Sequence, residues 1–415
     1  MVMTPYSYDA FLKSDALVRL ILEKMPIENK ARENFICRTF LLLMGLRGRY
    51  TFQNLSRYGY YGEQTYRNNY EKEFDFKTFN LELVKQSCSS HLITAFDPSF
   101  IPKSGKYTPN LGYFWSGCAG KAMKGLEIGG FAVVDMENNT ALSLESVQTP
   151  DPQQLKEADK TLVDHYAELV LERSKELESV SPYLAADGYF SKVKFVDAVC
   201  NGTNLHLVSK LRTDANLCYL YRGEYKGRGR PKTYQGKVDV NNPDEEQLPV
   251  CYRDEEVEIC SGVVYAKQLK RKIKVAYLRF LKKGKPIGKY QILFSTDTEL
   301  DGQSIFRYYK ARFQIEFLFR DAKQYTGLTH CQARSENKFH FHHNAALTTV
   351  SIAKAAHYLN CDKENRGAFS MRDIKNLYLN KMILDRFIEN FDLNANFEKN
   401  KIPIQKCLQY GNRAA

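Results

Sequence analysis

Four polar residues of the sequence recur at spacings that put them on one side of a helix. Tyr309, Arg312, Glu316 and Lys323 follow one another at intervals of three, four and seven positions. At about 100° per residue these offsets fall in a sector about 60° wide, so the four residues form one polar stripe. Aromatic and other apolar residues flank it. The pattern favours a groove between buried faces over a salt-bridge ladder on an exposed face.

Two aspartates stand where predicted strands end. Residues 92–96 read as a strand that stops at Asp97 and Pro98, because proline cannot continue the pairing. Residues 183–188 contain a second short strand, which ends in an acid, Asp187. The guanidinium of Arg312 and the ammonium of Lys323 in the stripe can both bind phosphate. A fold that brings the two aspartates close to these cations must combine a sheet with a helix.

The order of apolar segments predicts a mixed α/β sheet covered by helices, and this sheet would position the acids and the cations. The apolar patterns predict further strands at 126–134, 142–147 and 205–209, and helices at 152–177, 192–199, 299–325, 336–359 and 372–391. Residues 277–280 and 291–294 are predicted to pair as a hairpin. Residues 1–90 read as helical, with helices at 31–46 and 63–70. These two fit a helix-turn-helix or a plain helical bundle equally well.

The stripe and the two aspartates together resemble the signature of a known enzyme family. The spacing Y-x2-R-x3-E-x6-K of the stripe matches the Y-R-E-K signature of the IS4-type DDE transposases of bacterial insertion sequences. Residues 96–106, FDPSFIPKSGK, resemble the first-aspartate motif of that family, and residues 186–192, ADGYFSK, resemble the second. The three blocks stand in the family's order and cover roughly residues 90–345.

This resemblance implies an RNase H-like core, with Asp97 on the first strand, Asp187 at the end of the fourth and Glu316 on the helix after the sheet. It also implies a DNA transposase that binds the terminal inverted repeats of its insertion sequence. Such an enzyme catalyses Mg²⁺-dependent DNA cleavage and strand transfer by a cut-and-paste route. A catalytically inactive DNA-binding protein derived from such an element, and an RNase H-like nuclease, are the alternatives.

The chemistry of such an enzyme accounts for three acids. In-line attack on a phosphodiester uses two divalent ions about 3.5–4 Å apart, and Mg²⁺ prefers hard oxygen ligands such as carboxylates. We therefore expect Asp97, Asp187 and Glu316 to hold two Mg²⁺ ions, for which Mn²⁺ can substitute. Without cations three converging carboxylates repel one another, so at least one of their pKa values should be raised.

The resemblance further implies contacts with double-stranded DNA, both the terminal inverted repeats and the target. Tyr309, Arg312 and Lys323 are expected to grip the transposon-end strand. Arg320 and Lys103, which lie in the same motif blocks, are further candidates for DNA contact. Family logic also predicts a homodimer in the synaptic complex that brings two ends together.

Some relatives hold a flipped base on an aromatic side chain of the insertion. The one tryptophan of this chain, Trp115, lies between the first two acids instead. Tyr219, Tyr221 or Tyr225 of the insertion could take that role, and the residues alone leave the choice open.

The positive charge of the chain is concentrated in one stretch. The 415 residues carry 60 Lys and Arg against 48 Asp and Glu, a net charge of +12. Ten of the basic residues and no acid lie between residues 261 and 290. Such a run is either a solvated face or a footprint for a polyanion, which binds by releasing counterions. We assign Lys270, Arg271, Lys272 and Lys274 to a DNA track that leads to Glu316.

A second basic segment, KGRGRPK at residues 226–232, contains a Gly-Arg-Pro core like that of minor-groove hooks. Arg228 and Arg230 are therefore candidates for DNA contact, although a flexible charged loop explains the segment equally well. Four histidines, His330, His340, His342 and His343, cluster after the stripe. Their irregular spacing favours phosphate contact or surface placement over a metal site.

The predicted fold class is α/β: an RNase H-like mixed sheet flanked by helices, interrupted by a β-rich insertion, with an N-terminal helical domain and C-terminal helices. We expect an N-terminal helical, DNA-binding domain at 1–90, catalytic core at 91–213 and 297–360, a basic insertion at 214–296 and a helical region at 361–415. No apolar run reaches the about 18 residues of a membrane span. We expect a cytoplasmic, nucleoid-associated bacterial protein with reduced cysteines and no membrane partner.

Overall fold

The computed structural model of the chain describes residues 8–224, 227, 231–239, 242–360, 364, 366–395 and 397–412. For residues 8–12 and 398 it describes the backbone alone. Within these residues, none of the helices is both long enough and apolar enough to cross a membrane.

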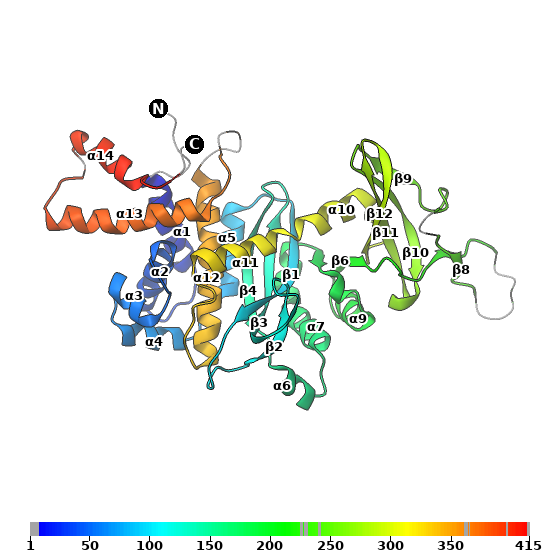
Figure 1. Ribbon diagram of the computed structural model, residues 1–415, viewed down its shortest axis with the longest axis horizontal. Coiled ribbons are helices and arrows are strands. Elements are labelled where there is room, and N and C mark those ends of the chain that lie inside the picture. The colour runs from blue at the N-terminus through cyan, green and yellow to red at the C-terminus, as the bar shows by residue number, and fades with distance from the viewer. Residues whose placement is uncertain are drawn as a thin grey trace.

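One mixed sheet forms the centre of the molecule (Figure 1). Its first part has the strand order β4-β3-β1-β5-β6. β3 is antiparallel to β1 and β4, whereas β1, β5 and β6 are parallel. This is the RNase H-like arrangement that the sequence predicts, with helices on both faces. The strands are β1 (Leu92–Pro102), β2 (Gly112–Ser116), β3 (Lys121–Asp135), β4 (Thr140–Gln148), β5 (Tyr183–Ala186) and β6 (His206–Leu211).

The β-rich insertion continues this sheet. β12 pairs antiparallel with β6, with Phe294 opposite Ser209, and the order then runs β12-β11-β10-β7-β8. β11 and β12 form the predicted hairpin, which turns at Lys283 and Gly284, both with positive φ. The insertion strands are β7 (Leu217–Leu220), β8 (Tyr234–Lys237), β9 (Val250–Arg253), β10 (Val257–Ala266), β11 (Arg271–Lys282) and β12 (Lys285–Ser295).

Each face of the sheet has its own hydrophobic core. On one face, Phe96, Leu184 and Ala186 pack with the helices between β4 and β6. These helices are α6 (Pro152–Glu157), α7 (Leu162–Glu172), α8 (Ser174–Val180) and α9 (Val193–Gly202). On the other face, Ile93 and Ala95 pack with helices from both ends of the chain. Because side chains alternate along β1, Asp97 points to this second face.

The second face is centred on α12 (Glu336–Asn360), which is buried along most of its length. Figure 1 shows helices from both ends of the chain around it. Their buried side chains belong to one continuous core. The predicted boundary at residue 90 therefore does not coincide with a gap in the core, and the domain boundaries stay predictions. The surrounding helices are α1 (Tyr8–Leu22), α2 (Lys30–Gly45), α3 (Phe52–Tyr58), α4 (Glu63–Glu71), α5 (Phe76–Ser87), α13 (Met371–Asn390) and α14 (Glu398–Leu408).

Two predicted helices are interrupted. The helix predicted at 152–177 is three helices, because Asp159 takes a positive φ of 54° and Thr161 starts a new capping box with Asp164. The helix predicted at 299–325 is α10 (Gly302–Ala311) followed by α11 (Gln314–Tyr325), with a turn at Arg312 and Phe313.

One predicted strand end is wrong. β1 does not stop at Pro98 but pairs with β3 as far as Pro102, opposite Gly125. On its other side β1 pairs with β5 only from Thr94 to Phe96. Beyond Phe96 that side is an open edge, where a residue without an N–H group is tolerated. Asp97 therefore lies inside β1, at the point where its pairing with β5 ends.

Candidate active site

Parallel pairing of β1 and β5 brings Asp97 and Asp187 to the same edge. Phe96 lies opposite Ala186 in this register, so the next residue on each strand is an aspartate. After Asp187 the chain turns into a short 3-10 helix, Gly188–Phe190. The hydroxyl of Ser209 on β6 donates to the Asp187 carbonyl at 3.0 Å and holds this turn against the next strand.

Glu316 follows an overwound turn between α10 and α11. The amide of Phe313 donates to the Lys310 carbonyl at 3.2 Å, and the amide of Glu316 donates to the Phe313 carbonyl at 3.1 Å. Both bonds span three residues, the spacing of a 3-10 helix, which is uncommon inside long helices. The turn divides the predicted single helix, yet the side chains of Arg312 and Glu316 still meet.

Residues of the polar stripe contact all three acids. Arg312 Nη1 lies 3.2 Å from Asp97 Oδ1, and Arg312 Nη2 lies 3.1 Å from Glu316 Oε1. The hydroxyl of Tyr309 donates to Asp187 Oδ1 at 3.4 Å, and the Tyr309 ring lies 5.6 Å from the Arg312 guanidinium carbon. Because Arg312 is 6% exposed, its charge acts on the acids in an environment largely free of water.

A glycine lets α11 approach the sheet closely. Gly130 of β3 pairs with Asp97, and a Cβ at Gly130 would lie 2.5 Å from Cζ of Phe319. The Phe319 ring therefore occupies the space that a side chain would fill. Since Phe319 and Glu316 are on the same helix, this contact sets the distance between Glu316 and β1.

The electrostatics follow from burial and from the crowding of acids. Burial raises the pKa of Asp97 to about 7, with Glu316 and Asp187 adding to the increase and Arg312 opposing it. This confirms the prediction that one carboxylate pKa would be raised. Burial also raises the pKa of Tyr309 to about 12, so its hydroxyl stays protonated and donates. Lys323 has a lowered pKa for the same reason.

The acids open into a cavity of about 1340 Å³ whose other walls the sequence did not reveal. Tyr113 and Trp115, on the exposed face of β2, line it together with Tyr189. Glu127 of β3 is a fourth, buried carboxylate that accepts a hydrogen bond from Tyr166 at 2.5 Å, and burial raises its pKa. A charged residue within the apolar run 126–134 was the available signal for Glu127.

A model of the family described as "Transposase DDE domain" matches residues 89–350. This segment is more than half of the chain and contains Asp97, Asp187 and Glu316. The chain belongs to the transposase DDE domain family. No curated protein matches it. Membership in this family implies an enzyme of the transposase or nuclease type. Enzymes of this family generally bind DNA and use divalent metal ions.

The side chains of Asp97, Asp187 and Glu316 are chemically suited to divalent cations. Their carboxylate oxygens are the hard ligands that such ions prefer. As the side chains stand, no group of three or more acids, histidines or cysteines among the described residues could hold a metal ion. The guanidinium of Arg312 pairs with both Asp97 and Glu316. In this arrangement a side chain of the protein itself compensates the charge of the two carboxylates.

Some of the predicted DNA-contact residues lie around the acidic cavity. Lys323 and Arg320 line it directly, and Lys323 Nζ donates to the Phe100 carbonyl at 2.9 Å. Lys103 lies in an adjoining pocket with Arg49 and Lys124, where its ammonium donates to the Cys331 carbonyl. Basic side chains therefore continue from the acidic cavity into its neighbour.

The basic residues of β11 do not form one surface. Side chains alternate along the strand, so Lys272 and Lys274 share the face that packs on α10. Arg271 points to the opposite face, where it forms an ion pair with Asp197 of α9 at 2.5 Å. Lys270 occupies the left-handed turn before β11. None of the four lines the acidic cavity described above, and their role in a DNA track stays a prediction.

Other sequence predictions have separate outcomes. Arg228, Arg230 and Tyr225 lie outside the described residues. The prediction of surface placement or phosphate contact is wrong for His342 and His343, which are 5% and 2% exposed. Both face the apolar core around α12, and His342 Nε2 hydrogen-bonds the Gly327 carbonyl at 2.8 Å.

Proposed function

We propose that the chain is an IS4-type cut-and-paste transposase in which Asp97, Asp187 and Glu316 bind the catalytic metal ions. The observation that supports this assignment is the convergence of the Y-R-E-K residues on the acids. Arg312 contacts two of the carboxylates and Tyr309 the third. A stripe that served only as a surface ladder would not reach acids from two separate strands.

The proposed ions are two Mg²⁺, with Mn²⁺ able to substitute. When bound, they activate a water or a 3′-hydroxyl and stabilise the leaving oxygen of the phosphodiester. The residues of the chain supply the surroundings. Asp97, Asp187 and Glu316 would hold the ions, and Arg312, which pairs with Asp97 and Glu316 in this structure, could then bind a DNA phosphate. Tyr309, which stays protonated, donates its hydrogen bond within the site.

The proposed substrate is double-stranded DNA, first the terminal inverted repeat of the element and then the target. Lys323, Arg320 and Lys103 would contact its phosphates from the walls of the acidic cavity and its neighbour. We keep the division into an N-terminal DNA-binding region at 1–90, a split catalytic core, the insertion 214–296 and the C-terminal region 361–415 as part of the proposal. A homodimer that holds two ends completes it.

Cleavage of a labelled terminal repeat tests the proposal. Inverted repeats in the DNA that flanks the gene supply the substrate, and the full chain should nick it in the presence of Mg²⁺. Asp97→Asn and Glu316→Gln should abolish nicking while retaining DNA binding, whereas Glu157→Gln, on exposed α6, should leave it unchanged. Nicking that survives both changes overturns the assignment of the acids. Binding without cleavage in the unaltered chain favours an inactive DNA-binding protein, and cleavage without preference for the repeat favours a nuclease.

A further inference from the structure

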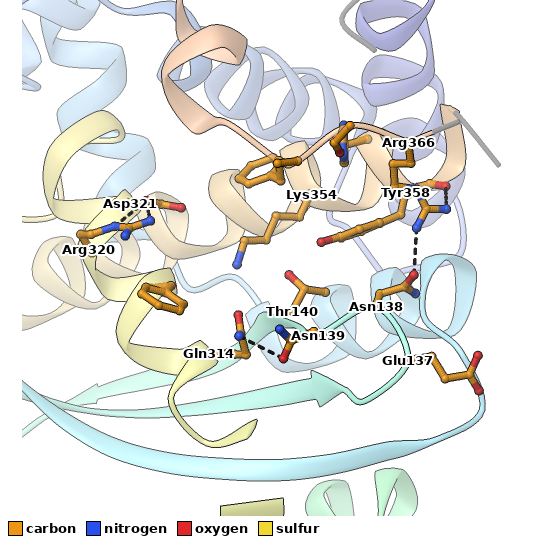
Figure 2. Close-up of a pocket in the computed structure, with 15 residues that line it drawn as sticks. Glu137, Asn138, Asn139, Thr140, Gln314, Arg320, Asp321, Lys354, Tyr358 and Arg366 are labelled. Atoms are coloured by element: carbon orange, nitrogen blue, oxygen red, sulfur yellow. Dashed lines mark hydrogen bonds and ion pairs between the residues drawn. The ribbon is translucent and has the colours of Figure 1, made fainter. Parts of the chain in front are cut away.

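A second pocket, of about 420 Å³, lies behind α11 and is separate from the acidic cavity. Figure 2 shows that its walls come from α11, the turn between β3 and β4, α12 and the segment after α12. Lys354 reaches from α12 toward Thr140, the first residue of β4. The side chains of Arg320 and Arg366 contribute two further positive charges to the lining. The pocket is therefore lined by cations from three elements.

Lys354 is a buried cation at the floor of this pocket. It is 3% exposed, and its ammonium donates to the Ala141 carbonyl at 2.9 Å. Burial lowers its pKa to about 8, so the group remains mostly charged at neutral pH. The ring of Phe369, 5.9 Å away, compensates the charge only weakly. A buried ammonium is costly unless an anion accompanies it.

The nearby acid Asp321 compensates the charge of Lys354 only in part. Its Oδ1 accepts two hydrogen bonds from Arg320, at 3.0 and 3.1 Å, and the positive charge of Arg320 opposes the effect of Asp321 on the pKa of Lys354. Glu137 is exposed and points away from Lys354 in Figure 2. Among the described residues, no carboxylate forms an ion pair with Lys354. The ammonium therefore faces the pocket with hydrogen-bonding capacity left for an anionic ligand.

The two cavities adjoin along one ridge of α11. Arg320 lines both, and the exposed rings of Phe313 and Phe317 continue the ridge from Glu316 toward the second pocket. The Arg320 guanidinium lies over the Phe317 ring at 4.8 Å. A nucleic acid strand that leaves the acidic cavity across this ridge meets a cation, then aromatic rings, then Lys354. Cations and aromatic faces in sequence are the usual surface for a strand.

We propose that the pocket around Lys354 binds a backbone phosphate of the DNA strand that passes over α11. The inference rests on the proposed function, because it takes the acidic cavity to hold DNA. A phosphate oxygen would accept from the Lys354 ammonium. Arg366 donates to Asn138 Oδ1 at 2.8 Å and to the Tyr358 carbonyl at 2.9 Å, so it adds positive charge to the wall of the pocket. The site would add one contact beyond the scissile position, and it would carry no base preference because phosphate contacts position a strand without reading it.

The test compares DNA binding by the full chain and by Lys354→Met at several salt concentrations, with a fluorescent duplex and fluorescence anisotropy. The logarithm of the affinity falls linearly with the logarithm of the salt concentration. Loss of one phosphate contact should make this slope less steep by about 0.9. Lys77→Met is the matched control, because Lys77 pairs with Glu176 on another part of the surface. Circular dichroism checks folding, and Lys354→Gln serves if the methionine variant is unfolded.

Each outcome decides the point. An unchanged slope for Lys354→Met, while the parent chain binds DNA, overturns the pocket and leaves the proposed function intact. Absence of DNA binding by the parent chain counts against the proposed function itself. Inorganic phosphate that raises the melting temperature of the parent but not of Lys354→Met, with equal DNA slopes, indicates a site for free phosphate. Stabilisation by polyglutamate alone indicates an acidic peptide instead, and both results overturn the DNA assignment.

Discussion

Arg312 and Asp97 form an ion pair, 3.2 Å between Nη1 and Oδ1, in which the two side chains are 8% and 18% exposed. The pair joins the turn between α10 and α11 to β1, a strand 215 positions away in the sequence. It therefore balances a buried carboxylate with a cation that the chain itself carries. The stability of the metal-free protein should depend on this pair.

Arg312→Met should lower the free energy of unfolding by about 3 kcal/mol in buffer with EDTA at pH 8, because it leaves Asp97 buried without its partner. Urea denaturation measures the change. Arg212→Met is the control, since the side chains of Arg212 and its partner Asp214 are 86% and 68% exposed and such a pair contributes little. Mg²⁺ should restore part of the stability of Arg312→Met. Equal losses for the two variants would show that the Arg312 pair has no special weight.

Gly130→Ala should impair both stability and DNA cleavage. The new Cβ would meet Phe319 at 2.5 Å, so α11 must shift away from β3 and carry Glu316 with it. Overpacking of this kind costs about 1–3 kcal/mol. Gly117→Ala, at the tip of the β2–β3 hairpin, has nothing within 4 Å of its Cβ and should behave like the parent. Normal cleavage by Gly130→Ala would mean that this contact does not position Glu316.

His342 should make stability depend on pH. Burial lowers its pKa from 6.5 to about 4. Because the folded pKa is the lower one, the unfolded chain binds the proton more readily between pH 6.5 and 4. The contribution of His342 is therefore complete above pH 6.5 and is lost as pH falls, by about 2 kcal/mol at pH 5. His342→Gln should remove this part of the slope in urea titrations at pH 7.5 and 5. A slope identical in the two proteins would contradict the assignment.

Trp115 should contribute to DNA binding without contributing to stability. The side chain is 64% exposed and lines the acidic cavity on β2, beside Tyr113. Stacking of an unpaired base on such a ring is worth about 1–3 kcal/mol. Trp115→Ala should weaken binding of a duplex with unpaired terminal bases by about 5-fold to 150-fold, while Trp115→Phe keeps most of it. Affinity that is the same for all three proteins would remove the ring from the binding surface.

The basic turn and strand of the insertion should affect the salt dependence of DNA binding. Lys270, Lys272 and Lys274 changed together to glutamine should lower the salt slope by up to about 2.7, at about 0.9 per phosphate contact. Arg271→Gln tests the fourth predicted residue separately, and its effect on the slope should be smaller because Arg271 is paired with Asp197 on the opposite face of β11. Anisotropy titrations measure the slopes. An unchanged slope in the triple variant would identify this stretch as an ordinary solvated face.

Much of the core could be predicted because local signals agreed with the tertiary structure. The strand that starts at Tyr183 was predicted, and it ends at Ala186, one residue before the predicted acid Asp187. What failed depends on partners far away in the sequence. Pro98 stays inside β1 because β5 has already ended on its open side. The turn at Arg312 and Phe313 interrupts a pattern whose apolar spacing continues across it.

The candidate site was predicted in its acids and cations but not in its walls. The motif spacing identified Asp97 and Arg312, whereas their direct contact depends on how the turn between α10 and α11 lies against β1. Trp115 gave no signal because its position in the cavity comes from the pairing of β2 with the far end of β3. The histidines misled for a related reason, because polar residues inside α12 look like a surface cluster until the surrounding helices are known.

The pairing of β12 with β6 has a consequence for how this chain can be shortened. In the core order β4-β3-β1-β5-β6, the outer side of β6 would be a free edge, and Val208 and Ser209 on it are buried. The insertion covers that edge with its own last strand, and an uncovered apolar edge strand is a template for aggregation. Excision of residues 214–296 would thus expose the edge of β6 to pairing with other chains. A soluble minimal version would have to keep β12 or replace it with a protective cap.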